Sequence, residues 1–135
     1  MVRMKPKFSG FRKRGEKVFE KGGIYMLEGE GTDIGCNLVF QEDIFRPSFL
    51  EMEVRGKIDK GAEWTRLRIE IYDKGKPDEP ADSFEGDYLN LDLSEELFKK
   101  LTFPVLGIVK CPSKVQFMIV GPSSSKLEVK NVSIR

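Results

Sequence analysis

The chain has 135 residues, of which 39% are hydrophobic and 33% charged, and its formal net charge is +1 at pH 7. These values are typical of one globular domain, here residues 1–135, with a densely charged surface. The small net charge argues against nucleic acid or a membrane surface as the partner. No apolar run approaches the ~18 residues of a membrane span, and no signal peptide is recognisable. The compartment is left open, and would be extracellular for a domain excised from a secreted enzyme.

Histidine is absent, which removes the commonest general base and the histidine-dependent nucleophile and metal sites. The two cysteines, Cys36 and Cys111, are far apart and form no CxxC motif. Cys36 alternates with apolar residues, so we expect a small buried side chain, with a Cys36–Cys111 disulfide as the alternative. These absences predict a protein without catalytic activity and without a cofactor.

Residues 1–21 carry eight lysines and arginines, including the cluster at 12–14. A basic arm that binds phosphates is one interpretation. The favoured interpretation is a solvated, partly ordered segment over 1–15, followed by an edge strand protected by lysines. Phe8 and Phe19 suggest that part of this segment packs onto the domain.

Downstream, short segments with alternating apolar and polar residues are separated by glycine, proline and serine, which predicts strands and turns. The expected strands cover residues 22–31, 34–41, 48–58, 62–73, 88–93, 114–121 and 126–135. In the last one the apolar phase shifts after Val129, which predicts a β-bulge at Lys130–Asn131. With the N-terminal edge strand this makes about eight strands, and the fold class predicted is an all-β, antiparallel β-sandwich of the jelly-roll type.

Two connections between the expected strands, residues 94–101 and 74–87, have distinctive sequences. Residues 94–101 (SEELFKKL) predict one short helical turn, with Ser94 as its N-cap and lysines at its end. Residues 74–87 are rich in proline, glycine and acid, which predicts a flexible acidic loop. A calcium site there would use Asp78, Glu79, Asp82, Glu85 or Asp87, but the spacing matches no EF-hand loop, and calcium is not favoured.

The segment Ala62–Asp73 (AEWTRLRIEIYD) is the most informative. Its alternate residues Leu67, Ile69 and Ile71 suit a buried sheet face. The opposite face carries an unusual row with an aromatic residue at each end, which we call the stripe: Trp64, Arg66, Arg68, Glu70 and Tyr72. In the usual jelly-roll pairing, strands beginning near Ile24, Ser48, Trp64 and Lys114 share one sheet, so Glu51, Glu53 and Gln116 are expected beside the stripe.

The ending VQFMIVGPSSSKLEVKNVSI resembles the close of carbohydrate-binding modules with the galactose-binding-like jelly-roll fold. The pattern FLEMEVRGKID...WTRLRIEIYD is similar to their middle strands, and the resemblance covers roughly residues 22 to 135. It implies a jelly roll and a non-catalytic function in binding oligo- or polysaccharide, in some cases as an appendage of a larger enzyme. Lys130 stands where many such modules have an acidic residue, which argues against the structural calcium ion that many members carry.

Sugar rings stack their C–H faces on aromatic side chains, and their hydroxyls bind planar polar groups. The stripe therefore predicts an extended glycan stacked on Trp64 and Tyr72, which lie about 26 Å apart by the rise of a strand. The hydroxyl-binding residues expected are Arg66, Arg68, Glu70, Glu51, Glu53 and Gln116.

Three alternatives stay open at this point. The arginines could form a cross-strand charge ladder with Glu51 and Glu53, each pair contributing ~0.2–1 kcal/mol. A glycosidase would need a carboxylate pair such as Glu53 and Glu70, which neighbouring arginines would hold ionised. A structural or protein-interaction domain would instead expose an apolar patch, for which the outward-facing candidates are Val39, Met118 and Val120.

Overall fold

The computed structural model describes residues 6–11, 16–40, 49–73, 75–85, 93–105 and 112–135. Within these ranges the protein is all-β, with eight strands whose pairings are all antiparallel. The strands are β1 (Lys7–Gly10), β2 (Glu16–Lys21), β3 (Ile24–Val39), β4 (Phe49–Lys60), β5 (Arg66–Asp73), β6 (Lys76–Glu85), β7 (Lys99–Pro104) and β8 (Pro112–Ile134). No helix among the described residues is long and apolar enough to cross a membrane.

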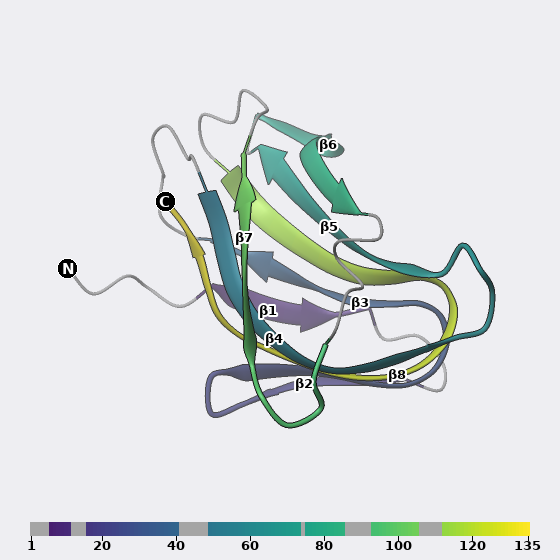
Figure 1. The fold of residues 1–135 in the computed structure, drawn as a ribbon. Coiled ribbons are helices and arrows are strands. Elements are labelled where there is room, and N and C mark those ends of the chain that lie inside the picture. The colour runs from purple at the N-terminus through teal and green to yellow at the C-terminus, as the bar shows by residue number, and fades with distance from the viewer. Residues whose placement is uncertain (1–5, 12–15, 41–48, 74, 86–92, 106–111) are drawn as a thin grey trace.

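Two long strands, β3 and β8, run through both layers of a β-sandwich (Figure 1). The first half of β3 and the second half of β8 form one layer with β2, β4 and β7, which we call the β4 layer. The second half of β3 and the first half of β8 form the other with β1, β5 and β6, which we call the β5 layer. The predicted antiparallel β-sandwich is therefore confirmed.

The strands bend between the layers at residues with unusual backbone geometry. The register of β3 against β8 shifts between Thr32 and Ile34, where Asp33 has a φ of 58° and Gly121 a φ of 92°. The amide of Gly121 donates to Asp33 Oδ1 at 3.0 Å, which joins the two strands at the bend. Next to it, Gly31 lies opposite Ser123, and these small residues leave room for the change of direction.

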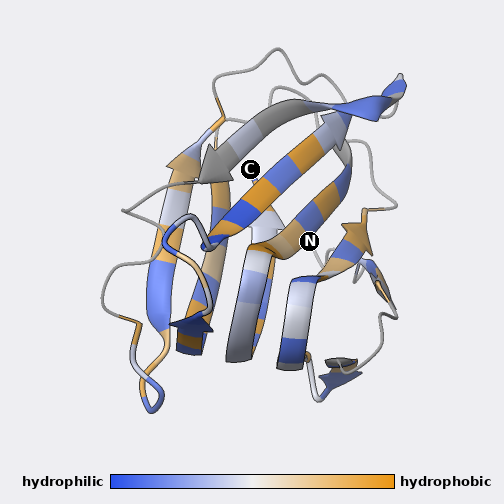
Figure 2. Cartoon of the chain, turned by 90° about the vertical axis from the view of Figure 1, so that its right-hand side faces the viewer, coloured by the Kyte–Doolittle hydropathy of each residue, from blue (hydrophilic) through white to orange (hydrophobic). Residues whose placement is uncertain are grey.

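Alternation along each strand builds the core, and Figure 2 shows it as bands of opposite hydropathy. Among the described residues, most inward residues of the predicted strands are buried as expected, including Leu67, Ile69 and Ile71 on β5 and Cys36 on β3. Phe117, which is 1% exposed, lies between Cys36 and Ile69 in the register of β3, β8 and β5. Cys111 lies outside the described residues, so the alternative of a disulfide stays a prediction.

Several predicted boundaries were wrong. Residues 22–31 and 34–41 belong largely to one strand, β3, and the two C-terminal strands with the serine-rich turn between them form the single strand β8. The acidic segment after Asp73, expected to be a loop, contains β6, which pairs with β5 and forms the edge of its layer. An edge strand tolerates proline because one side of its backbone needs no partner. The strand predicted at 88–93 lies almost entirely outside the described residues.

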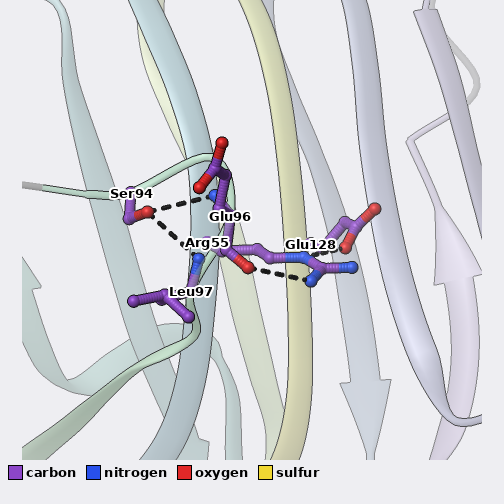
Figure 3. A network of polar contacts seen from close by, with 5 residues as sticks. All are labelled: Arg55, Ser94, Glu96, Leu97 and Glu128. Carbon is purple, nitrogen blue, oxygen red and sulfur yellow. Dashed lines mark hydrogen bonds and ion pairs between the residues drawn. The ribbon is translucent and has the colours of Figure 1, made fainter.

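The helical turn predicted at 94–101 is not formed. Ser94 Oγ accepts the amides of Glu96 and Leu97, both at 3.0 Å, as a helix cap would (Figure 3). The chain then continues as β7, which pairs with β4, because backbone pairing at a sheet edge outweighs a short local helical preference.

The segment before β7 is attached to β4 through Arg55 and Gly56. The amide of Gly56 donates to Ser94 O at 2.7 Å, and Arg55 Nη1 donates to Glu96 O at 3.3 Å. Arg55 also forms an ion pair with Glu128 of β8, with 2.5 Å between Nε and Oε2 (Figure 3). These contacts fix residues 94–97 against the β4 layer.

The β-bulge predicted near the end of β8 is confirmed. Glu53 lies opposite Lys130, whereas Glu51 lies opposite Ser133, so β8 contains one extra residue between these pairs. Asn131 takes up the extra residue with a φ of 52°, a conformation that asparagine tolerates better than most residues.

Candidate functional site

The stripe lies on the outer face of the β5 layer. β5 places Arg66, Arg68, Glu70 and Tyr72 on the side opposite Leu67, Ile69 and Ile71, which are buried. Across the sheet, Glu70 lies opposite Gln116 of β8, a residue that was expected beside the stripe. The neighbours in register on β8 are Val120 beside Arg66, Met118 beside Arg68 and Lys114 beside Tyr72.

Trp64 stands at one end of the stripe, in the connection that leads into β5. Its side chain is 56% exposed, although its ring packs against the bend of β8: a Cβ atom built on Gly121 would lie 2.6 Å from Trp64 Cζ3. The next residue, Thr65, is buried and its Oγ1 donates to Pro122 O at 2.9 Å. Arg66 Nη1 donates to Trp64 O at 3.0 Å. Trp64 is thus an exposed ring on a fixed backbone.

The other end of the stripe is a network of polar side chains. Glu70 is only 7% exposed, with Oε1 at 3.5 Å from Arg68 Nε and Oε2 at 3.2 Å from Tyr72 Oη. Tyr72 Oη is also 3.1 Å from Gln116 Oε1. The Tyr72 hydroxyl has one proton, and it donates this proton to the Glu70 carboxylate, which is the stronger acceptor. In the alternative orientation of its side-chain amide, Gln116 would donate a hydrogen bond from Nε2 to Tyr72 Oη. Glu70 therefore holds Tyr72 in position and has little surface left for a ligand.

Burial, followed by the charge of Glu70, raises the pKa of Tyr72 above the ordinary value of 10.0. Tyr72 consequently stays protonated and able to donate through neutral and mildly alkaline pH. The stability that depends on the neutral phenol is present below pH 10 and falls as the pH rises through the raised pKa, because the folded state then has to hold a charged phenolate.

We expect Glu70→Gln to lower the pKa of Tyr72 towards the ordinary value, because the substitution removes the negative charge and retains the burial. The pKa is measured by following the Tyr72 ring carbon by NMR during an alkaline titration. Tyr25, whose pKa burial also raises, serves as the internal reference and should not shift. An unchanged Tyr72 titration would contradict the assigned contact with Glu70.

Lys114 covers part of Tyr72. Its Nζ lies 4.1 Å from the centroid of the Tyr72 ring, a cation–π contact. The alternating pattern of the strand indicates that Lys114, which precedes the inward residue Val115, faces outward. That it lies beside Tyr72 follows only from the register of β5 and β8. Of the two aromatic residues of the stripe, Trp64 is the more accessible.

Glu51 and Glu53 do not lie beside the stripe, so their predicted placement was wrong. Both belong to β4, which pairs with β7 and the second half of β8, whereas β5 pairs with β6 and the first half of β8. Glu51 Oε1 instead binds Arg135 Nη2 at 2.6 Å, and Glu53 accepts from Asn131 Nδ2. The proposed charge ladder with Arg66 and Arg68, and a shared groove for Glu53 and Glu70, are excluded by the same topology.

In the part of the chain that the structure describes, no group of three or more acidic or cysteine side chains is arranged to hold a metal ion. Asp87, one of the calcium candidates, lies outside that part. The side chains of Asp78 and Glu79 are exposed on the edge strand β6.

No protein-family model and no curated protein matches this chain. Solved structures do: a mutant of a carbohydrate binding module of family 29 is 14% identical, with 94% of this chain and 78% of that chain covered and a TM-score of 0.62. A family 29 mutant complexed with mannohexaose is 13% identical, with 93% and 78% covered and a TM-score of 0.60. Another, complexed with cellulohexaose, is 14% identical, with 93% and 78% covered and a TM-score of 0.59.

These similarities show that the chain has the same β-sandwich fold as these modules. They agree with the fold that the sequence resemblance implied, over nearly the whole chain.

Proposed function

We propose that this protein is a non-catalytic carbohydrate-binding module that binds an extended glycan along the stripe. The observation that carries this proposal is Trp64, a tryptophan that is 56% exposed and held on a fixed backbone at the end of a polar sheet face. An exposed indole is a large apolar surface in water, and the C–H face of a sugar ring matches it in size and chemistry.

The rest of the stripe supplies groups for sugar hydroxyls. Arg66 and Arg68 are partly exposed and offer planar donor groups next to Trp64. Gln116 and Tyr72 follow at the far end, where Glu70 acts as a positioning residue for Tyr72. A glycan that reaches from Trp64 to Tyr72 would be several sugar units long, which agrees with the hexasaccharides bound by structurally similar modules.

A non-catalytic role fits the same observations. The family 29 structures are named as binding modules, and the carboxylate pair considered for a glycosidase is split between the two layers. As a binding module, the chain would act by holding other domains of a larger enzyme close to their polysaccharide.

The alternative is a structural or protein-interaction domain, which would expose an apolar patch. Its candidates Met118 and Val120 are partly buried, and Val39 is 36% exposed, less than Trp64. An isolated exposed tryptophan flanked by arginines suits a sugar better than a protein partner with a broad apolar core.

The test is titration of the protein with mannohexaose and cellulohexaose in a calorimeter. We expect binding of at least one, and Trp64→Ala should weaken it by about 2 kcal/mol or more, roughly 30-fold, as for a central aromatic contact.

Phe19→Ala is the matched control, because Phe19 is an aromatic residue of similar exposure (40%) on β2, in the other layer. Its affinity should equal that of the wild type. Equal affinities of Trp64→Ala and wild type would sink the proposal for the stripe.

A further inference from the structure

We propose a second binding site, for a short neutral sugar, in a pocket of the β4 layer that is separate from the stripe. The pocket has a volume of about 600 Å³, within the ~300–1,000 Å³ usual for small-molecule sites. It lies beside the bulge of β8 and is lined by both glutamates that were expected beside the stripe, Glu51 and Glu53.

The pocket forms where β8 continues beyond the first residue of its neighbour β3. β3 begins at Ile24, which lies opposite Lys130, so among the described pairs the last residues of β8 are bonded to β4 alone. The bulge at Asn131 turns β8 next to the residue where β3 begins, and Gly23 adds no side chain to fill the gap. Pro6 also lines the pocket.

The lining combines apolar and hydrogen-bonding surfaces. Val132 and Pro6, which are both partly exposed, provide apolar wall against which the C–H face of a sugar ring can pack, whereas Tyr25 and Met52 lie behind it and are 7% and 1% exposed. Carboxylate, amide, hydroxyl and ammonium groups complete it; they belong to Glu51, Glu53, Asn131, Ser133 and Lys100. A few polar groups converging on an apolar wall are characteristic of small-ligand sites.

The charges of the pocket decide between a sugar and a cationic ligand. Glu51 Oε1 lies 2.6 Å from Arg135 Nη2 and 4.0 Å from Lys100 Nζ, so this carboxylate already has cationic partners. Glu53 accepts a hydrogen bond from Asn131 and lies opposite Lys130 and Lys100 in register. Because lysine and arginine balance the two acids, the pocket has no excess of negative charge to hold a cation, whereas carboxylates fixed in this way accept hydrogen bonds from hydroxyls.

The size and chemistry fit one or two sugar rings. Glu51 and Glu53 act as acceptors for ligand hydroxyls, Lys100 acts as donor, and Ser133 can do either. Between Gly121, on which Trp64 packs, and Asn131 at the pocket, β8 extends for about 33 Å of strand and passes into the other layer. A disaccharide therefore cannot touch both sites, and the pocket does not depend on the stripe.

The experiment uses the Trp64→Ala protein, in which the stripe is disabled, and titrates it with cellobiose and with mannobiose while amide signals are followed by ¹H–¹⁵N NMR. We expect at least one disaccharide to shift the signals of Gly23, Asn131, Val132 and Ser133 in a saturable way. Movement of none of them at the highest concentration of either sugar would overturn the proposal.

A second protein carries Glu53→Gln and Lys100→Ala in addition. Both changes are structurally mild, since glutamine has the shape of glutamate and the Lys100 side chain is 66% exposed; a circular dichroism melt checks the fold. Loss of hydrogen bonds to charged groups should weaken the disaccharide by about tenfold or more. Unaltered affinity would also overturn the proposal.

The two sites can fail separately. Hexasaccharide affinity that falls roughly 30-fold in Trp64→Ala reports on the stripe, and shifts at 131–133 caused by a disaccharide report on the pocket. Shifts at 131–133 without any effect of Trp64→Ala on the hexasaccharides would support the pocket and reject the stripe.

Discussion

Replacing Phe117 with alanine should lower the free energy of unfolding by about 3–5 kcal/mol, the usual cost of removing a fully buried aromatic side chain. Phe117 is 1% exposed and lies on β8, between Cys36 of β3 and Ile69 of β5. All three strands are held in register on both sides of the residue, so the sheet cannot collapse readily into the cavity. A loss of this size is a large part of the ~5–15 kcal/mol that stabilises a typical domain.

The measurement is equilibrium unfolding in urea, followed by tryptophan fluorescence and by circular dichroism. Phe19→Ala is the control, since it removes the same side chain from a surface position on β2 and should cost no more than about 1 kcal/mol. If the two variants were equally stable, the assignment of Phe117 to the centre of the core would be wrong.

Gly56→Ala should be the second severe change, with a loss of about 2–5 kcal/mol from overpacking and backbone strain together. Gly56 has a φ of 138°, and a Cβ atom there would lie 2.0 Å from Lys126 O and 2.8 Å from Leu127 Cα. Both contacts are to backbone atoms of β8, the partner strand of β4, so neither can move aside without breaking the ladder.

Gly22→Ala separates the two contributions. Gly22 has a φ of 60° with no atom within 4 Å of the new Cβ, so only the backbone term of about 1–2 kcal/mol applies. Urea midpoints of the two variants are compared at constant slope. A Gly56→Ala protein no less stable than Gly22→Ala would contradict the close approach of β4 and β8.

The parts of the fold that the sequence predicted are those governed by alternation. Leu67, Ile69 and Ile71 are buried, and Arg66, Arg68 and Tyr72 face outward, because a strand places successive side chains on opposite sides whatever its partners are. The bulge after Val129 was predicted for the same reason, as a change of phase within one strand.

Local signals misled where pairing with a distant strand overrode them. Ser94 caps its neighbours as it would in a helix, but the following residues pair with β4 as β7. Glycine and serine near 29–31 and 122–125 suggested turns, yet β3 and β8 pair with each other through this region and bend together. Proline and acidic residues after Asp73 suggested a loop, although an edge strand accommodates them.

The candidate site divided in the same way. Trp64, Arg66, Arg68, Glu70 and Tyr72 came together from one strand and its approach, so the sequence alone could group them. Gln116 lies beside them because β8 pairs with β5. Glu51 and Glu53 lie in the other layer instead, where they line the pocket. Lys114 and the role of Glu70 as support for Tyr72 followed only from cross-strand contacts.

By itself, then, the sequence determined the fold class, the inward and outward faces of most strands, the bulge and the outward-facing row of the stripe, because each depends on residues close together in the chain. Only the tertiary structure decided which strands are neighbours, which layer each glutamate occupies and where a pocket opens. Those features depend on pairs such as Glu70 with Gln116 and Glu53 with Asn131, whose members lie far apart in the chain. A single sequence does not indicate which distant strands pair.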